Sequence, residues 1–234
     1  MSLLEANAGF LLTGLARTLE LALATLFCAT LVSVIVGLMS VARSRLLRIL
    51  ALCYVEFWRD IPLLVNLLFV YFGAPLIGIP LSPFLAALVS ISLWGGANGA
   101  EIVRGGISAI PAHQSVSATA LGLTHWEIFR FIILPQALMP ILPPMTGLFT
   151  LLIQATSLAS LVGVTEFFRI SQIVVERTTM QEGESPAFIV YGFTLAVYFV
   201  VCSILTQLTK RLERRLVLRG TTPVSGGRIL RESV

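Results

Sequence analysis

Five long apolar stretches limit the fold of this chain more than any other feature of its sequence. A stretch of about 20 apolar residues crosses a bilayer as a helix, because lipid offers no partner for a free backbone N–H or C=O group. The expected spans are residues 18–41, 49–73, 83–100, 131–152 and 187–208. The pattern predicts an all-α polytopic membrane protein with five transmembrane helices.

The composition supports the same class. Hydrophobic residues make up 56% of the 234 residues and charged residues 12%, whereas a soluble domain carries about 25% charged residues. A soluble fold of this length cannot bury so much apolar surface. The composition also excludes a disordered chain and a nucleic-acid-binding domain, since both need a far more polar sequence.

Basic residues are distributed unevenly around the expected spans. Twelve of the sixteen Lys and Arg residues lie within 43–48, within 104–130 or beyond residue 208, and five spans place all of these on one side. Cytoplasmic loops carry an excess of Lys and Arg, so we expect this side to face the cytoplasm. The N-terminus is then outside and the C-terminus inside. Residues 1–219 are expected to form the transmembrane domain, and residues 220–234 a flexible cytoplasmic tail.

The sequence contains no motif of a motor or an enzyme. No Gly-x-x-x-x-Gly-Lys-Ser/Thr loop is present to hold a nucleotide, so energy for transport must come from a partner or an ion gradient. His113 and His125 lack a further ligand at metal spacing, and no convergent nucleophile and base stand out. We therefore expect no catalytic residue and no metal site. An ion-coupled secondary transporter is the alternative function, although no internal repeat is evident.

The segment between the third and fourth spans is the most informative. A short helix that includes Gln114 is expected to end at Gly122 in a left-handed conformation. Thr124 and Glu127 have the spacing of a capping box, which predicts a second short helix. This second helix is expected to end at residues 134–135, where proline prevents simple continuation. The pair of helices is either a docking element for a cytoplasmic partner or a connector that packs only on its own chain.

This segment resembles the loop of ABC-importer membrane subunits, whose pattern is Glu-Ala-Ala, three residues, Gly, and then Ile-x-Leu-Pro. Gly122 occupies the glycine position, but Val116 stands where the family usually has glutamate. The resemblance extends from about residue 14 to residue 215 and favours the branch that includes histidine, glutamine and arginine permeases. The matching stretches are residues 54–59, 62–65, 101–111, 134–138, 156–158 and 212–215.

The resemblance implies a function and a set of partners. It implies a permease subunit, not an enzyme, that moves a polar amino acid or a derivative in an ATP-driven importer. This chain would bind no cofactor, because ATP-Mg would be bound by the partner. The implied partners are two ATP-binding cassette subunits, a second permease subunit in a homodimer or heterodimer, and an extracytoplasmic solute-binding protein. The residues implied to couple to the ATPase are Gln114, Ser117, Ala118, Ala120, Leu121, Gly122, Leu134 and Pro135.

Charged residues inside the second span are candidates for a substrate path, because ionisable groups in a bilayer normally face a partner or a wet cavity. Glu56 and Arg59 are expected to pair, which would leave Asp60 for the ammonium group of a ligand. The alternative is a self-satisfied ion pair near the cytoplasmic end of this span. Glu101 and Arg104 can also pair, as a gate or as an interfacial anchor.

Three neutral polar residues follow the fourth span. Gln154, Thr156 and Ser157 either join helices or line a path. The family often has Lys-Asp directly before Thr-Ser-Leu, whereas this chain has Gln154 and Ala155. We expect weaker selection for a charged substrate side chain as a result.

Overall fold

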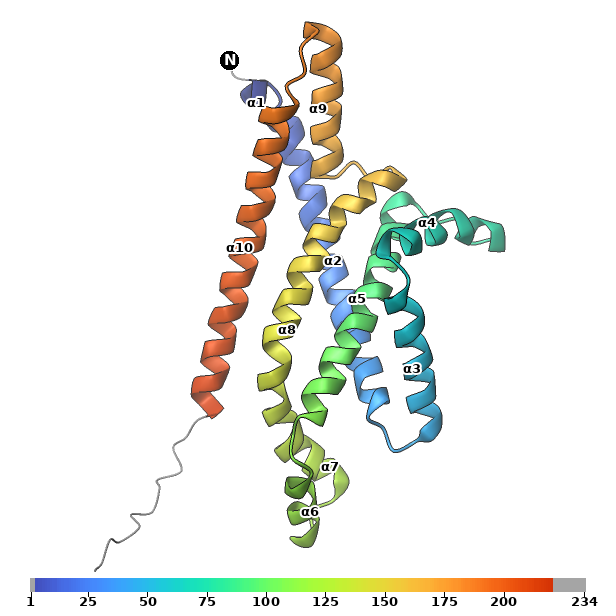
Figure 1. The fold of residues 1–234 in the computed structure, drawn as a ribbon, viewed down its shortest axis with the longest axis vertical. Coiled ribbons are helices and arrows are strands. Elements are labelled where there is room, and N and C mark those ends of the chain that lie inside the picture. Colours follow the sequence, from blue (N-terminus) through green and yellow to red (C-terminus); the bar gives the residue numbers. More distant parts are fainter. Residues whose placement is uncertain (1–2, 221–234) are drawn as a thin grey trace, which may run out of the picture.

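The computed structural model describes the backbone of residues 3–220 and the side chains of residues 3–211. Every regular element in these residues is a helix, which confirms the all-α expectation for this part of the chain. Residues 221–234 of the expected tail lie outside the described residues. The long helices run roughly along the longest axis of an elongated molecule (Figure 1).

In chain order the elements are α1 (Leu3–Ala6), α2 (Ala8–Ser40), α3 (Arg45–Asp60), α4 (Leu63–Gly73), η1 (Ala74–Ile77), α5 (Pro83–Ser108), α6 (Ala112–Ala120), α7 (His125–Ile128), η2 (Phe129–Ile133), α8 (Leu134–Ala155), η3 (Thr156–Val162), α9 (Phe167–Glu182) and α10 (Ala187–Gly220).

Three of the described helices are long and apolar enough to cross a membrane: Ala8–Ser40, the continuous helix His125–Val162, and Ala187–Arg211. A bent pair, α3 with α4 and η1, makes a fourth if it counts as one span. The 26-residue helix α5 is long enough as well, but it is not among them. Its glycines and its polar residues Asn98 and Glu101 lower its apolar content. The described residues therefore support three to four spans and do not confirm five.

Close packing of α5 against α2 forms the centre of the molecule. The glycines of α5 allow it, because a Cβ atom at Gly99 would lie 1.9 Å from the Ser33 hydroxyl oxygen and one at Gly96 would lie 2.4 Å from Val32. On another side of α5, a Cβ atom at Gly95 would lie 2.7 Å from Leu152 of α8. Small residues let helix backbones approach closely. The small-residue run of α5 thus packs between two helices of the same chain.

The second expected span is not a straight helix. The chain bends by 101° between α3 and α4, and Ile61 adopts an extended conformation with φ −88° and ψ 133°. Proline disfavours the helical region for the residue that precedes it and has no N–H group to donate. Pro62 therefore breaks the helix expected over residues 49–73.

The segment between α5 and α8 largely follows the sequence expectation. Helix α6 ends at Gly122, whose φ is +85°, and the N–H groups of Gly122 and Leu123 donate to the carbonyls of Thr119 and Ala118. This is the Schellman arrangement. The capping box of Thr124 and Glu127 is present at the start of α7. Both local predictions are confirmed.

The expected end of the second short helix at residues 134–135 is wrong. Helix α7 continues through η2, a π-helical turn, into α8. Proline lacks the N–H group that an α-helix requires, and a π-helical turn widens the backbone locally. Pro135 lies in the first turn of α8, directly after η2, so the helix passes the proline without a break.

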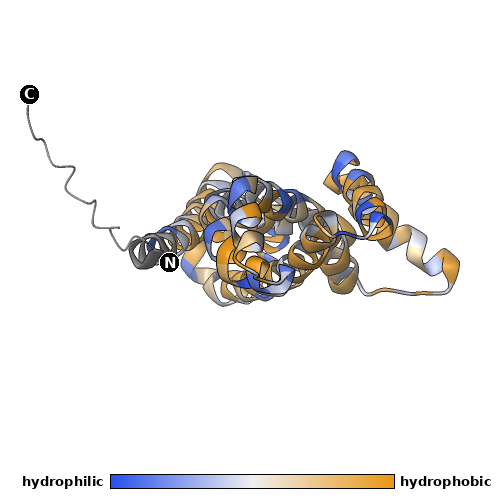
Figure 2. Ribbon diagram, turned by 90° about the horizontal axis from the view of Figure 1, so that it is seen from below, coloured by the Kyte–Doolittle hydropathy of each residue, from blue (hydrophilic) through white to orange (hydrophobic). Residues whose placement is uncertain are grey.

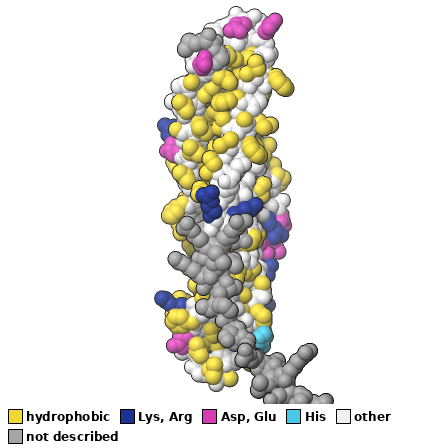
Figure 3. Space-filling model, turned by 90° about the vertical axis from the view of Figure 1, so that its left-hand side faces the viewer, with side chains coloured by type: hydrophobic (Ala, Val, Ile, Leu, Met, Phe, Trp, Pro, Cys, Tyr) yellow, Lys and Arg dark blue, Asp and Glu magenta, His cyan; other side chains and the backbone are white. Residues whose placement is uncertain are grey.

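The two ends of the molecule differ in structure. The N-terminus and α9 lie at one end, and the α2–α3 turn, α6 and α7 lie at the other (Figure 1). Seen along the long axis, most of the ribbon is hydrophobic (Figure 2). Figure 3 shows apolar side chains over most of one long face, with acidic side chains at its α9 end. Glu176 and Glu182 of this acidic end belong to helix α9.

Candidate functional site

The residues implied to couple to an ATPase gather at the α6 end of the molecule. Most of them lie in α6 or in the turn that follows it, and Leu134 and Pro135 begin α8. Gln114 joins the two groups, because its side-chain amide pairs with that of Gln136 in α8 through hydrogen bonds of 3.1 and 2.6 Å. Ala118 is buried against the rest of the segment. The segment thus has defined contacts with its own chain.

The outward side of this segment carries exposed apolar side chains. Val116 is 69% exposed and Leu121 is 81% exposed, and Trp126 of α7 is also exposed and stacks on Phe129. Val116 occupies the position at which the resembling family usually has glutamate, so this surface offers an apolar contact in place of a carboxylate. On the other side of the segment, the Arg43 guanidinium contacts the His125 ring and joins the α2–α3 turn to α7.

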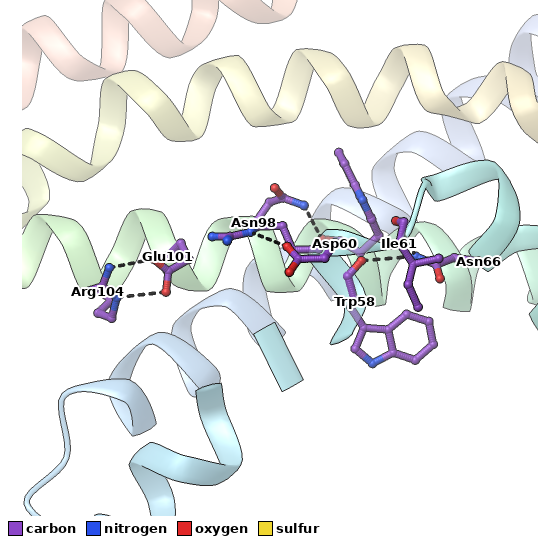
Figure 4. Close-up of polar contacts among 9 residues, drawn as sticks. Trp58, Asp60, Ile61, Asn66, Asn98, Glu101 and Arg104 are labelled. Carbon is purple, nitrogen blue, oxygen red and sulfur yellow. Dashed lines mark hydrogen bonds and ion pairs between the residues drawn. The ribbon is translucent and has the colours of Figure 1, made fainter. Parts of the chain in front are cut away.

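A row of polar side chains lies along one side of α5 (Figure 4). It runs from Arg104 and Glu101 past Asn98 to Asp60 at the end of α3. Glu101 accepts two hydrogen bonds from the Arg104 guanidinium, at 2.9 and 2.7 Å. The predicted pairing of these two residues is therefore present. Asn98 donates to the carbonyl of Trp94 in its own helix, at 2.9 Å.

The expected pairing of Glu56 with Arg59 is wrong. Arg59 instead contacts Asp60, with 3.4 Å between Nε and Oδ1, so Asp60 is not left unpaired for a ligand. Asp60 lies at the far end of α3 from the basic α2–α3 turn, about 22 Å away at 1.5 Å per residue. Glu56 lies on the exposed side of α3.

Sequence inspection missed Asn66, which is 3% exposed. Its side-chain amide donates to the carbonyls of Trp58 and Ile61, at 3.2 and 3.3 Å (Figure 4). In an unbroken helix the Trp58 carbonyl would accept from residue 62, but Pro62 has no N–H group. Asn66 therefore supplies the missing donor at the bend. The sequence feature that could have indicated this role is an asparagine four residues after a proline, inside an apolar stretch.

The polar residues after the fourth span divide into two kinds. Thr156 is fully buried and donates to the Ile153 carbonyl, at 2.7 Å. The Ser157 hydroxyl donates to the Gln154 carbonyl, also at 2.7 Å. The side chains of Gln154 and Ser157 nevertheless line open grooves between α8 and α10. Only two of the three expected residues thus face space that a ligand could enter.

The two grooves are adjacent and share three lining residues, Gln154, Leu195 and Tyr198. One has a volume of about 520 Å³ and the other about 310 Å³. These volumes are in the range that holds small organic ligands. Their lining mixes apolar side chains with hydroxyl and amide groups. The remaining polar residues of the two linings are Ser157, Tyr191, Thr194, Ser203, Thr206 and Gln207.

Glu166 is a second residue whose role the sequence did not reveal. It is fully buried and accepts hydrogen bonds from the backbone N–H groups of Phe168 and Arg169, at 2.8 and 2.7 Å. It also accepts from the hydroxyls of Tyr198, at 3.0 Å, and Thr18, at 3.3 Å. The carboxyl group caps α9 and connects it to α2 and α10. The position of Glu166 directly before a helix is the sequence feature that could have indicated this capping role.

Comparison with known proteins agrees with this geometry. Residues 19–217 match the family described as binding-protein-dependent transport system inner membrane component. A probable amino-acid ABC transporter permease protein, YckA of Bacillus subtilis, is 34% identical over 88% of each chain. The glutamine transport system permease protein GlnP of Escherichia coli is 34% identical over 71% of this chain and 74% of its own.

A solved structure has the same fold. The crystal structure of an amino acid ABC transporter with histidines superposes with a TM-score of 0.80 at 28% sequence identity. The superposition covers 92% of this chain and 99% of that one. Sequence and fold therefore agree over most of the described residues. The chain belongs to the binding-protein-dependent transport system inner membrane component family, the permease subunits of ABC importers.

Proposed function

We propose that this chain is the permease subunit of an ATP-driven importer for a polar amino acid or an amino-acid derivative. The observation that carries the proposal is the agreement of family and fold over most of the chain, including a permease of 34% identity and an amino acid transporter with a TM-score of 0.80. The relatives include permeases for glutamine and for L-cystine. A small polar substrate also suits grooves lined by amide and hydroxyl groups.

The proposed topology has five spans, with α5 and the bent pair α3–α4 as two of them. Helix α5 has 26 residues, which is about 39 Å at 1.5 Å per residue and exceeds the apolar core of a bilayer. Many of its residues are buried against other helices, so its polar groups need not face lipid. The α6 end then faces the cytoplasm with the C-terminus, and the N-terminus and α9 face outside, as the positions of the basic residues favour.

The proposed energy source is a pair of cytoplasmic ATPase subunits that bind ATP-Mg and contact the α6–α7 segment. The exposed apolar side chains Val116 and Leu121 support a contact surface there, because such groups gain free energy when a partner covers them. A partner moves an equilibrium between two states only by as much as it binds them differently. ATP-dependent closure of the ATPase pair would supply this difference.

The proposed substrate path includes the grooves beside Gln154 and Ser157. The pair of Arg59 with Asp60 and the pair of Glu101 with Arg104 lie along α5 and would form polar parts of the path or of its gate. Glu56 and Thr156 contribute less directly, since one lies on the exposed side of α3 and the other is buried. A second permease subunit would complete the path, and a solute-binding protein would deliver the ligand at the α9 end.

Reconstitution tests the proposal. The chain is placed in proteoliposomes with the ATPase and the solute-binding protein that we expect neighbouring genes to encode, and uptake of labelled glutamine, histidine and arginine is measured. We expect uptake that needs ATP, the ATPase and the binding protein. Uptake that persists without the ATPase and collapses with a proton or sodium ionophore would instead establish an ion-coupled secondary transporter.

A further inference from the structure

Helix α6 is joined to α8 by a reciprocal pair of side-chain amides. Gln114 Nε2 donates to Gln136 Oε1 at 3.1 Å, and Gln136 Nε2 donates to Gln114 Oε1 at 2.6 Å. Among the residues that the structure describes, these are the only side-chain hydrogen bonds between α6 and another helix. Each amide acts as donor and acceptor at once, so this solvent-exposed pair limits the separation of the two helices.

Gln136 is also attached to the π-helical turn η2. Its Nε2 atom donates to the Ile132 carbonyl at 2.8 Å, within the turn that precedes Pro135. A π-helical turn has a wider backbone than an α-helix and often occurs at functional positions. One amide therefore contacts α6, the turn and the start of α8. A displacement of α6 can therefore reach α8 through this amide as well as through the turn at Gly122.

The remaining connections of α6 are weaker constraints. The chain enters α6 at Pro111 and leaves it through the left-handed residue Gly122. A Cβ atom at Gly122 would meet nothing within 4 Å, so this turn is open on its outer side. Packing on α6 centres on one buried residue, Ala118. Without the amide pair, α6 could rotate about these two connections while α8 stays in place.

We propose that Gln114 and Gln136 are positioning residues that hold α6 and α8 as one rigid body during the transport cycle. The inference rests on the proposed function, in which an ATPase moves α6. Helix α8 leads directly to Gln154 and the grooves beside α10. The pair therefore couples the ATPase contact to the substrate path by a continuous physical connection. Loss of the pair lets ATP hydrolysis proceed without an equal movement of α8.

The test uses the complete transporter in proteoliposomes and measures substrate transported per ATP hydrolysed, with glutamine, histidine and arginine as probes. We expect Gln114→Ala and Gln136→Ala each to lower this ratio about fivefold, as the loss of a pair of hydrogen bonds implies. The double variant should be no worse than either single variant, because the two residues act as a unit. Gln114→Glu should give an intermediate ratio, since a carboxylate still accepts from Gln136 Nε2 but no longer donates to Gln136 Oε1.

A distance measurement gives a second readout. Spin labels are placed at Thr119 in α6 and at Gly147 in α8, in a background without native cysteines. Both positions are exposed, and an added Cβ at Gly147 meets nothing within 4 Å. We expect one distance with and without ATP in the otherwise unchanged chain, and a broader distribution in the Gln114→Ala variant. Thr30→Ala in α2 is the control and should change neither readout, because this hydroxyl donates only to the Leu26 carbonyl of its own helix.

Failure of the inference is distinct from failure of the proposed function. If the unaltered transporter shows no ATP-driven uptake, the proposed function is wrong and the inference falls with it. If the unaltered transporter works but the ratio is unchanged in Gln114→Ala, the inference alone is wrong. It is also overturned if the two alanine substitutions are additive, or if either one lowers ATPase binding in a co-purification assay, which would make the residue a partner contact.

Discussion

The bend between α3 and α4 depends on one buried side chain, and replacing it should destabilise the protein strongly. Asn66 Nδ2 donates to the carbonyls of Trp58 and Ile61. Pro62 denies the Trp58 carbonyl its usual helical partner. In lipid or in a protein interior no water replaces a lost donor. The substitution Asn66→Leu keeps the branching and the number of heavy atoms of the side chain and removes both hydrogen bonds.

The expected size of the effect follows from the two carbonyl groups. A buried polar group that loses its partner costs about 1–3 kcal/mol. Both bonds are long, at 3.2 and 3.3 Å, so we take the lower half of this range and expect about 2–4 kcal/mol in total. Asn66→Asp should cost more than Asn66→Leu, because a carboxylate oxygen would then face the two carbonyl oxygens without a proton to share.

The assay is thermal unfolding of the purified chain in detergent or nanodiscs. About 2–4 kcal/mol corresponds to a decrease in Tm of about 4–16 °C for a chain of this size. Asn98→Leu is the matched control, since it removes one amide bond to the Trp94 carbonyl. That carbonyl keeps its helical partner, the N–H of residue 98 itself. The control should lower Tm by less than about 3 °C, for a loss below about 1 kcal/mol.

The reasoning would be refuted by equal effects at the two positions. If Asn66→Leu and Asn98→Leu lower Tm by the same amount, then a hydrogen bond to a carbonyl that lacks a helical partner because of Pro62 stabilises the protein no more than one to a carbonyl that keeps its partner. A stabilising effect of Asn66→Leu would be a stronger contradiction, because apolar packing at the bend would then outweigh both hydrogen bonds.

Three further predictions test other parts of the structure. Gly99→Ala should lower the free energy of unfolding by about 1–3 kcal/mol, measured by thermal unfolding, since the added methyl group overlaps a side chain of α2. Gly105→Ala, where the added methyl meets open space, should be neutral or stabilising. A larger loss of stability at Gly105 than at Gly99 would contradict the close packing. Glu166→Ala should lower the free energy of unfolding by about 2–4 kcal/mol, because α9 loses its cap and two buried hydroxyl groups lose their acceptor. An equal loss of stability in Glu176→Ala would refute this reasoning. Uptake assays should find neutral and charged amino acids transported at comparable rates, because Gln154 replaces a charged residue of the family pattern; exclusive arginine uptake would contradict it.

Local signals in the sequence predicted local structure well. Gly122 ends α6 in the left-handed conformation, and Thr124 with Glu127 forms the expected capping box. Both features depend on residues within four positions of each other, so the chain fixes them without help from the rest of the fold. The pairing of Glu101 with Arg104 is local in the same sense.

Features set by contacts between distant segments were not predictable from one sequence. Glu166 meets Thr18 across 148 positions of the chain, and no pattern near either residue identifies this contact. Pro135 and Pro62 have the same intrinsic effect on a backbone, yet the chain bends by 101° at one and continues as a helix at the other. Contacts with the surrounding helices determine whether the chain bends or continues at a proline. Such contacts cannot be predicted from the residues next to the proline.

Two polar side chains in this chain serve the same purpose at two irregular points of the backbone. Asn66 satisfies carbonyls at the α3–α4 bend, and Glu166 caps the N–H groups at the start of α9. A free backbone group away from water is costly, so a polar residue near a proline or a helix end is explained first by the backbone beside it. The Gln154 side chain bonds no backbone group among the described residues, and it lines both grooves. Tyr198 also lines both grooves, but its hydroxyl already donates to Glu166, so Gln154 is the polar residue of the shared lining that we propose to meet a ligand.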